Sequence, residues 1–468
     1  MTTGSKPHQL SAAAAATAIR NGSLSPTSLV EDLLRRIDEL EPMLMAWVTI
    51  DKEGALAAAN DSVIELEKSG PRGPLHGVPV GLKDIFYTAG LKTTAGSPIY
   101  ANFVPEHDST AVARFRQALP GHSWQVAHRQ AGAIVLGKTV TTEFADGDPS
   151  PTFNPWNLEH TPGGSSSGSG VAIATGMCPI ATGSQTVGST LRPASYNGIV
   201  GLKPTLGRIS TYGVVPVSFS TDTVGIMVRT VEDAALTLDV LAGYDPKDPG
   251  SANVPVGQYH AAVHRRQTPP RIGLLKDFFY ERAEDEVRTH TDSVAQKLAT
   301  AGAIVDEVTL PEYFAKSIEE IASVVWAETA AFHKNSYADH RQDYGPNISA
   351  RMDRALESSP IPYIEAQQGR RLLQNSMQGL FNQYDVLLSP CTPGPAPKDR
   401  TTTGPTFFQA PWTWIGCPTI GVPSGLAANG MPLAVQLAAG AFEEERLLGV
   451  AAWCERVLGV HLTPMNPH

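Results

Sequence analysis

The sequence has few cysteines, no excess of positive charge and no long hydrophobic run. Its four cysteines lie far apart without the C-x-x-C pairs of zinc sites and redox centres, so we expect reduced thiols and no cysteine-bound zinc or redox centre. A formal net charge of −10 disfavours nucleic acid as a ligand. No apolar stretch reaches the ~18 residues of a membrane span. We therefore expect a cytoplasmic protein without a membrane segment.

The composition is that of an ordinary globular protein, with 42% hydrophobic and 18% charged residues. At roughly 150 residues per domain, the length alone would allow about three domains. No stretch rich in proline, serine or charge separates independent units, however. We predict a single domain over residues 1–468.

Patterns of apolar residues predict strands that alternate with helices. A helix begins at Ser25-Pro26 and is expected to end at Pro42. Strand-like runs lie at 77–86, 133–136, 303–310 and 385–389, and helical patterns at 171–176, 285–300 and most of 313–384. This alternation predicts an α/β layered fold.

Two short segments match known functional motifs, but the residues around each segment do not support the corresponding chemistry. Residues 132–139 match the G-x-x-x-x-G-K-[ST] phosphate loop, but Ala-Ile-Val-Leu between the glycines favours a buried strand. Nucleotide binding is therefore a remote alternative. Residues 164–168 match the G-x-S-x-G nucleophile elbow with Ser166 as nucleophile. The polar, proline-containing segment 159–163 is not the strand that an elbow follows, so an α/β-hydrolase is disfavoured.

Two turns rich in glycine and serine form a third constellation. At 162–170 the side chains are small enough for the backbone to approach another chain closely. The turn at 183–189 ends on Ser189, and the N–H groups before it can point at one place. Convergent donors beside a hydroxyl suit acyl transfer, whose intermediate carries an oxyanion. Two ordinary turns would have the same composition, so composition leaves both interpretations open.

Lys83 is a candidate base for such a serine. It follows an apolar run, and burial at a strand end would lower the pKa of a lysine toward neutrality. A solvated surface lysine paired with Asp84 is the alternative. No serine is followed three residues later by lysine, so a Ser/Lys site must be assembled from distant segments.

Taken together, these segments resemble the amidase signature family. The resemblance is carried by 77–84, 93–97, 137–144, 154–157, 162–170, 198–208, 222–225, 229–233, 384–390, 416–418 and 430–437. It implies an amidase signature fold, with a large mixed β-sheet sandwiched between α-helices. The signature core would be 65–240, completed by 380–460, and 313–384 would be a helical region that lines the substrate.

The resemblance also implies a Ser–cisSer–Lys triad that needs no metal and no cofactor. Ser189 is the nucleophile, Ser165 the bridging serine on a cis peptide and Lys83 the terminal base, with Gly164 and Ser166 in support. The implied oxyanion hole consists of the backbone N–H groups of Thr186, Val187, Gly188 and Ser189. The implied reaction cleaves a C–N bond of an amide, anilide or carbamate through an acyl-enzyme.

Three features depart from the family pattern. Members often read Asp-Thr-Gly-Gly-Ser where this chain has Gln185-Thr-Val187-Gly-Ser189, so we expect a pocket of different shape. Arg192 lies one position further from the nucleophile than the arginine of many relatives. Residues 119–129 interrupt a connection that relatives usually make directly.

Substrate identity depends largely on 313–384 and 407–414, and no motif covers these segments. The aromatic residues Phe407, Phe408, Trp412 and Trp414 either form a wall for a hydrophobic or aryl substrate or belong to the core. The family also includes the glutaminase component of a tRNA-dependent amidotransferase, which works with partner chains. The altered turn favours a free-standing amidase, monomeric or homodimeric, that acts on a small-molecule amide or on a urethane-type (carbamate) substrate.

Overall fold

A computed structural model describes residues 6–116, 131–266 and 268–465, and the predicted interruption at 119–129 lies outside them. In these ranges one mixed sheet has the strand order β1-β3-β2-β4-β6-β5-β10-β11-β9-β7-β8. The strands are β1 (Trp47–Ile50), β2 (Pro79–Lys83), β3 (Ile134–Thr139), β4 (Ile180–Gln185), β5 (Val200–Lys203), β6 (Thr223–Val228), β7 (Arg271–Leu275), β8 (Ile304–Val308), β9 (Val386–Pro390), β10 (Thr419–Leu426) and β11 (Pro432–Ala438). The predicted α/β fold with a large mixed sheet is confirmed.

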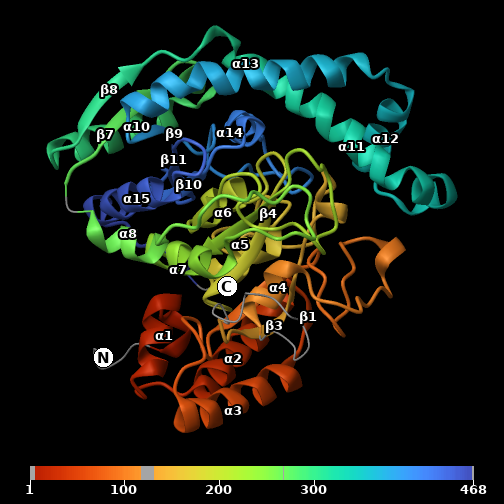
Figure 1. The fold of residues 1–468 in the computed structure, drawn as a ribbon, viewed down its shortest axis with the longest axis vertical. Coiled ribbons are helices and arrows are strands. Elements are labelled where there is room, and N and C mark those ends of the chain that lie inside the picture. The colour runs from red at the N-terminus through yellow and green to blue at the C-terminus, as the bar shows by residue number, and fades with distance from the viewer. Residues whose placement is uncertain (1–5, 117–130, 267, 466–468) are drawn as a thin grey trace.

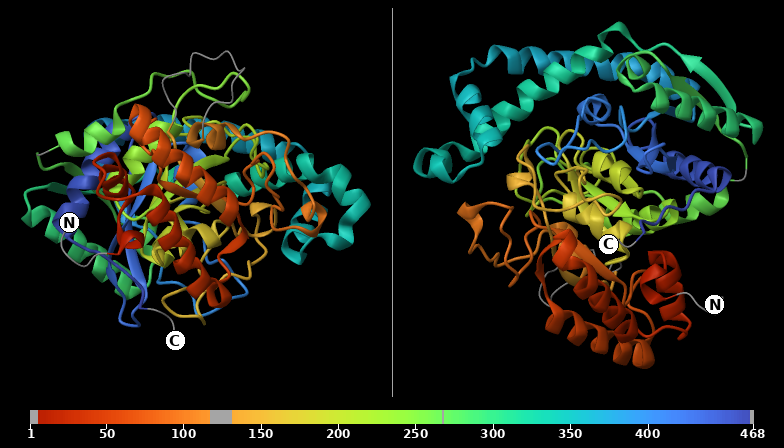
Figure 2. Two further views of the ribbon diagram at one scale, coloured as in Figure 1. Left: turned by 90° about the horizontal axis from the view of Figure 1, so that it is seen from below. Right: turned by 180° about the vertical axis from the view of Figure 1, so that it is seen from behind.

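Helices pack around this sheet. They are α1 (Ala12–Arg20), α2 (Pro26–Leu44), α3 (Lys52–Ser69), α4 (Thr110–Phe115), α5 (Ser167–Ala174), α6 (Leu191–Asn197), α7 (Val231–Leu241), α8 (Tyr259–Arg265), α9 (Phe279–Arg282), α10 (Asp285–Thr300), α11 (Ser317–His340), α12 (Pro346–Glu357), α13 (Ile361–Gln383), α14 (Ala410–Ile415) and α15 (Glu444–Leu458). Helices α1–α3 lie at one end of the molecule, and α11–α13 arch over the opposite end (Figures 1 and 2). None of the described helices is both long and apolar enough to cross a membrane.

Helix α2 is longer than its sequence pattern predicts. It begins as predicted, with Ser25 Oγ accepting a hydrogen bond from the N–H of Thr27. It continues past Pro42, which we expected to end it, and stops where Met45 adopts a left-handed conformation (φ 50°). A proline at this position removes one backbone hydrogen bond and crowds the carbonyl one turn earlier. The extension in return buries Leu44.

The segment that matches a phosphate loop is a buried strand. All six residues of β3 are buried, and the strand pairs with both β1 and β2. The ammonium of Lys138 lies inside the protein, where it donates hydrogen bonds to Phe86 O and Thr93 Oγ1 and lies 3.7 Å from Asp84 Oδ1. The segment therefore presents neither its backbone N–H groups nor its lysine to a phosphate. The nucleotide-binding alternative is wrong.

We expect Lys138→Met to lower the free energy of unfolding by about 3–5 kcal/mol, because it leaves the buried carboxyl of Asp84 without its cationic neighbour. Urea denaturation would measure the change. The matched control is Lys52→Met, which removes an exposed ion pair with Asp38 and should cost at most about 1 kcal/mol. Equal, small losses in both variants would contradict the buried position of Lys138.

Candidate active site

Lys83 is the last residue of β2 and is completely buried. Its backbone N–H donates a hydrogen bond to Thr182 Oγ1 of the neighbouring strand β4 (2.8 Å). Its Nζ lies 2.6 Å from Ser165 Oγ and 2.7 Å from Ser184 Oγ. Lys83 is therefore not the solvated surface lysine paired with Asp84 that the sequence left open. Ser184, which the sequence analysis did not single out, is a second hydroxyl neighbour.

The surroundings of Lys83 favour a neutral amine. Burial lowers the pKa of Lys83 well below its ordinary value; the negative charge of Asp222 opposes this shift, and the positive charge of Arg192 adds to it. Burial also raises the pKa of Asp222 to about 6, against hydrogen bonds from Thr186 Oγ1 and the N–H of Val217. A neutral lysine beside a serine hydroxyl can accept a proton from it.

The serine-rich loop contacts both Lys83 and the turn that carries Ser189. The Gly164–Ser165 peptide is cis. Ser165 Oγ contacts the lysine, and the N–H of Ser166 donates to Ser189 O (3.3 Å). A Cβ on Gly164 would lie 2.8 Å from Thr403 Cγ2, so this position has no room for a side chain.

Ser166 does not have the setting of a nucleophile elbow. Its side chain is buried, and its Oγ accepts a hydrogen bond from the N–H of Ser184 (3.3 Å). Helix α5 follows directly, but no strand precedes the loop at 159–165. Ser166 also does not line the cavity that Ser189 lines. The elbow motif is therefore a coincidence of composition.

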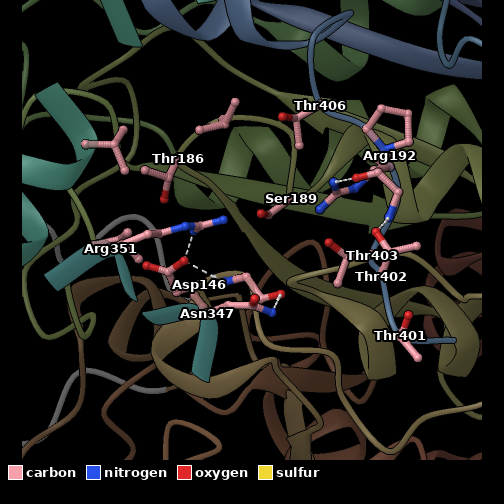
Figure 3. Close-up of a pocket in the computed structure, with 17 residues that line it drawn as sticks. Asp146, Thr186, Ser189, Arg192, Asn347, Arg351, Thr401, Thr402, Thr403 and Thr406 are labelled. Atoms are coloured by element: carbon pink, nitrogen blue, oxygen red, sulfur yellow. Dashed lines mark hydrogen bonds and ion pairs between the residues drawn. The ribbon is translucent and has the colours of Figure 1, made fainter. Parts of the chain in front are cut away.

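Ser189 lines a cavity of about 390 Å³ (Figure 3). Its walls come from segments far apart in the sequence: the turn that carries Ser189, the chain at 145–147, the irregular segment 401–406 and helix α12. Arg192 connects the segment 401–406 to the serine-rich loop, because its guanidinium donates to Gly404 O and to Gly164 O. This gives the displaced arginine of the sequence a structural role.

The turn before Ser189 has unused backbone donors. None of the N–H groups of 186–189 donates a hydrogen bond to another described residue. Thr186, Val187 and Ser189 line the cavity. Donors that are held in place and have no partner can stabilise a negative charge that develops on a substrate oxygen. The arrangement is therefore chemically suited to acyl transfer at Ser189.

Gln185 fixes the shape of this turn. Its Oε1 accepts hydrogen bonds from the N–H groups of Thr190 (3.1 Å) and Leu191 (3.0 Å), at the start of α6. Its Nε2 donates to Thr413 Oγ1 (3.0 Å), which in turn donates to Val187 O (2.7 Å). The amide therefore ties the turn to both α6 and α14. The sequence marked Gln185 as a departure from the family pattern and did not assign it this role.

The four aromatic residues proposed as a substrate wall do not line the cavity. Phe408, Trp412 and Trp414 are at most 1% exposed and pack among neighbouring core side chains, and Phe407 packs partly buried against them. The irregular segment 401–406, which contains four threonines, takes the place expected for them. Burial in the core removes more apolar surface from water than a position on a polar cavity wall would, so the core alternative is the correct one.

Two charged residues that the sequence did not predict meet in the cavity. Arg351 of α12 forms an ion pair with Asp146, whose side chain is only 2% exposed. The guanidinium of Arg351 points across the cavity toward Ser189 (Figure 3). Burial lowers the pKa of Arg351. No sequence signal could have paired these residues, because they are 205 positions apart and neither belongs to a motif.

Comparison with known proteins gives one consistent result. Residues 28–448 match the family described as Amidase. The chain is 36% identical to a glutamyl-tRNA(Gln) amidotransferase subunit of Geobacter sp. (strain M21), over 94% of this chain and 95% of that protein. It resembles the peptide amidase of Stenotrophomonas maltophilia (TM-score 0.84, 30% identity, 98% and 99% of the two chains). A 6-aminohexanoate cyclic dimer hydrolase is also similar (TM-score 0.82, 26% identity, 97% and 98%).

We expect a fluorophosphonate to label Ser189, because this serine combines access to the cavity with nearby unused N–H donors. Peptide mapping by mass spectrometry would locate the label. It should disappear in Ser189→Ala and persist in Ser166→Ala, which removes the competing nucleophile. A label on Ser166 in the unmodified protein would contradict the assignment.

Proposed function

This chain belongs to the amidase family, and we propose that it is a free-standing hydrolase that cleaves amide-type C–N bonds through a Ser189–Ser165–Lys83 relay. The observation that carries the proposal is the 2.6 Å separation between the buried Lys83 Nζ and Ser165 Oγ. Burial lowers the pKa of Lys83, so its amine can act as a base. A serine nucleophile needs such a base for activation, and Ser165, which contacts the lysine, would connect it to Ser189.

In the proposed first half-reaction, Ser189 Oγ attacks the carbonyl carbon of the substrate. Its proton passes to Ser165 Oγ, while the proton of Ser165 passes to the neutral Nζ of Lys83. The carbonyl oxygen becomes an oxyanion, which the N–H groups of 186–189 hold. When the C–N bond breaks, the relay returns a proton to the departing amine and leaves an acyl-enzyme on Ser189.

In the proposed second half-reaction, water takes the place of the amine. The relay removes a proton from the water as it attacks the acyl carbon, and the C–O bond to Ser189 then breaks. The proton returns to Ser189 Oγ, so the acid is released and the enzyme is regenerated. The same relay would act on an amide, an anilide or a carbamate, because each presents a carbonyl carbon bonded to nitrogen.

The cavity wall supports a polar acyl group. Within the described chain, the guanidinium of Arg351 donates a hydrogen bond only to Asp146, although it has five N–H groups. Thr402 and Thr403 face the same space, and Asn347 lies beside the ion pair (Figure 3). We propose that the acyl part of the substrate carries a carboxylate or carbonyl that accepts from Arg351.

A second candidate function is that of an amidotransferase component. Several relatives are named as subunits of a glutamyl-tRNA(Gln) amidotransferase, including proteins of Geobacter and of Roseiflexus sp. (strain RS-1), the latter 35% identical over 97% of this chain. A protein of that kind would depend on partner chains. An assay of amine release by the chain purified alone would distinguish the two candidates, because a free-standing hydrolase releases amine without added partner chains.

We expect Lys83→Arg to lower kcat by roughly 10²–10⁴-fold, the usual contribution of a general base. Arginine keeps a positive charge at every working pH and cannot accept the proton. Wild-type kcat/KM should fall as the pH drops through the lowered pKa of Lys83, because protonation removes the base. Amine release measured against pH would test both points. Turnover by Lys83→Arg close to that of the wild type would refute the relay.

We expect Arg351→Met to raise KM for amides with a carboxylate on the acyl chain by roughly 10–100-fold, the cost of a lost hydrogen bond to a charged group. The KM for neutral amides of the same length should change much less. The control is Arg354→Met, because Arg354 lies on the same helix and packs over Trp326 outside the cavity. Equal effects on charged and neutral substrates would rule out the proposed contact.

A further inference from the structure

Two histidines and a glutamate meet on the surface where α8 packs against α7. His260 and His264 are four residues apart on α8, so their rings lie on one face of the helix. Glu232 belongs to the first turn of α7. Its Oε1 lies 3.1 Å from Nε2 of each histidine, and the two Nε2 atoms are 3.5 Å apart. The three side chains thus turn one ligand atom each toward a common point.

These separations match the distances between ligand atoms around one metal ion. Zinc binds histidine nitrogen and carboxylate oxygen at about 2.0–2.2 Å, and tetrahedral geometry then sets neighbouring ligand atoms roughly 3.3–3.5 Å apart. Two imidazoles and one carboxylate form a donor set that suits zinc, nickel and copper. We propose that Glu232, His260 and His264 form a binding site for a divalent transition metal such as zinc.

The backbones that carry these ligands are held in place by other contacts. Asp239 of α7 accepts hydrogen bonds from the N–H groups of Tyr259 (2.8 Å) and His260 (3.1 Å) at the start of α8. The first turn of α7 is capped by Thr230, whose side chain accepts from the N–H of Asp233. Because both helices are fixed, metal binding would order little more than three side chains.

The exposure of the ligands indicates what kind of site this is. The side chains of Glu232, His260 and His264 are 41%, 35% and 58% exposed. A bound metal would therefore keep at least one position open to water or to an outside ligand, in contrast to the closed sites of structural zinc. None of the three residues lines the cavity of Ser189. The site would join α7 to α8 and would take no part in amide hydrolysis.

Isothermal titration of the full chain with zinc chloride tests this proposal. The chain is first treated with a chelator, and the titration is carried out at about pH 7.5, where imidazole is mostly neutral. We expect one zinc per chain at this site. Loss of a residue that only supports a metal ligand weakens metal binding roughly 10–100-fold. We expect at least this loss of zinc affinity in each of the three ligand variants, which are His260→Ala, His264→Ala and Glu232→Gln. The matched control is His340→Ala, which removes an exposed histidine 3.5 Å from Asp343 but without a second imidazole.

A second readout separates a bound metal from a plain hydrogen-bonded cluster. Zinc should raise the Tm of the wild-type chain, and this rise should be lost in His264→Ala, the variant at the most exposed of the three ligands. Amide hydrolysis should be the same in all these variants. Zinc binding that is absent in the wild type, or equally strong in the wild type and in the three ligand variants, would overturn the proposal.

Discussion

The burial of Lys83 is the constraint on which the candidate site depends. An ammonium without water around it is costly, so the interior favours the neutral amine. Strand β2 lies between β3 and β4 in the sheet, and its last residue therefore has protein on both sides. The two serine hydroxyls at 2.6 and 2.7 Å satisfy the amine without adding charge. A carboxylate in the place of either hydroxyl would favour the charged form and remove the base.

Close packing of the two serine segments against neighbouring parts of the chain depends on small residues. At Gly168 a Cβ would collide with the backbone of Ala46 and Val140, so only glycine allows α5 to lie against β3. At Gly188 a Cβ would lie 2.9 Å from Gln409 Oε1, in the turn that leads to Ser189. The glycines of both segments therefore act through packing, which lets distant parts of the chain meet within hydrogen-bonding distance.

The centre of the site and its walls come from different kinds of segment. The lysine and serines lie at strand ends and tight turns of the sheet, whereas Arg351 and the threonines at 401–406 come from a helix and an irregular segment around it. A protein named as a peptide amidase and one named as a 6-aminohexanoate cyclic dimer hydrolase share the fold of this chain. A common core with variable walls is how one fold serves several substrates.

Much of the fold and the centre of the site could be predicted from the sequence, because the signals are local. Apolar periodicity located β2, β3, β9 and α10, and motif order identified the family. Local patterns failed wherever the outcome depended on distant neighbours. The same aromatic run at 407–414 suits a pocket wall or a core, and only the packing of α14 decided for the core.

Local patterns also could not predict the ion pair in the cavity or the surface cluster of Glu232, His260 and His264. Arg351 meets Asp146 across 205 positions, and Glu232 meets His260 of α8 across 28. The sequence by itself determined the family and the residues that could carry the chemistry, since motifs and turn composition are local properties of the chain. Only the tertiary structure decided which charges line the cavity and which side chains share a surface, because contacts between distant segments follow from how the sheet and its helices pack.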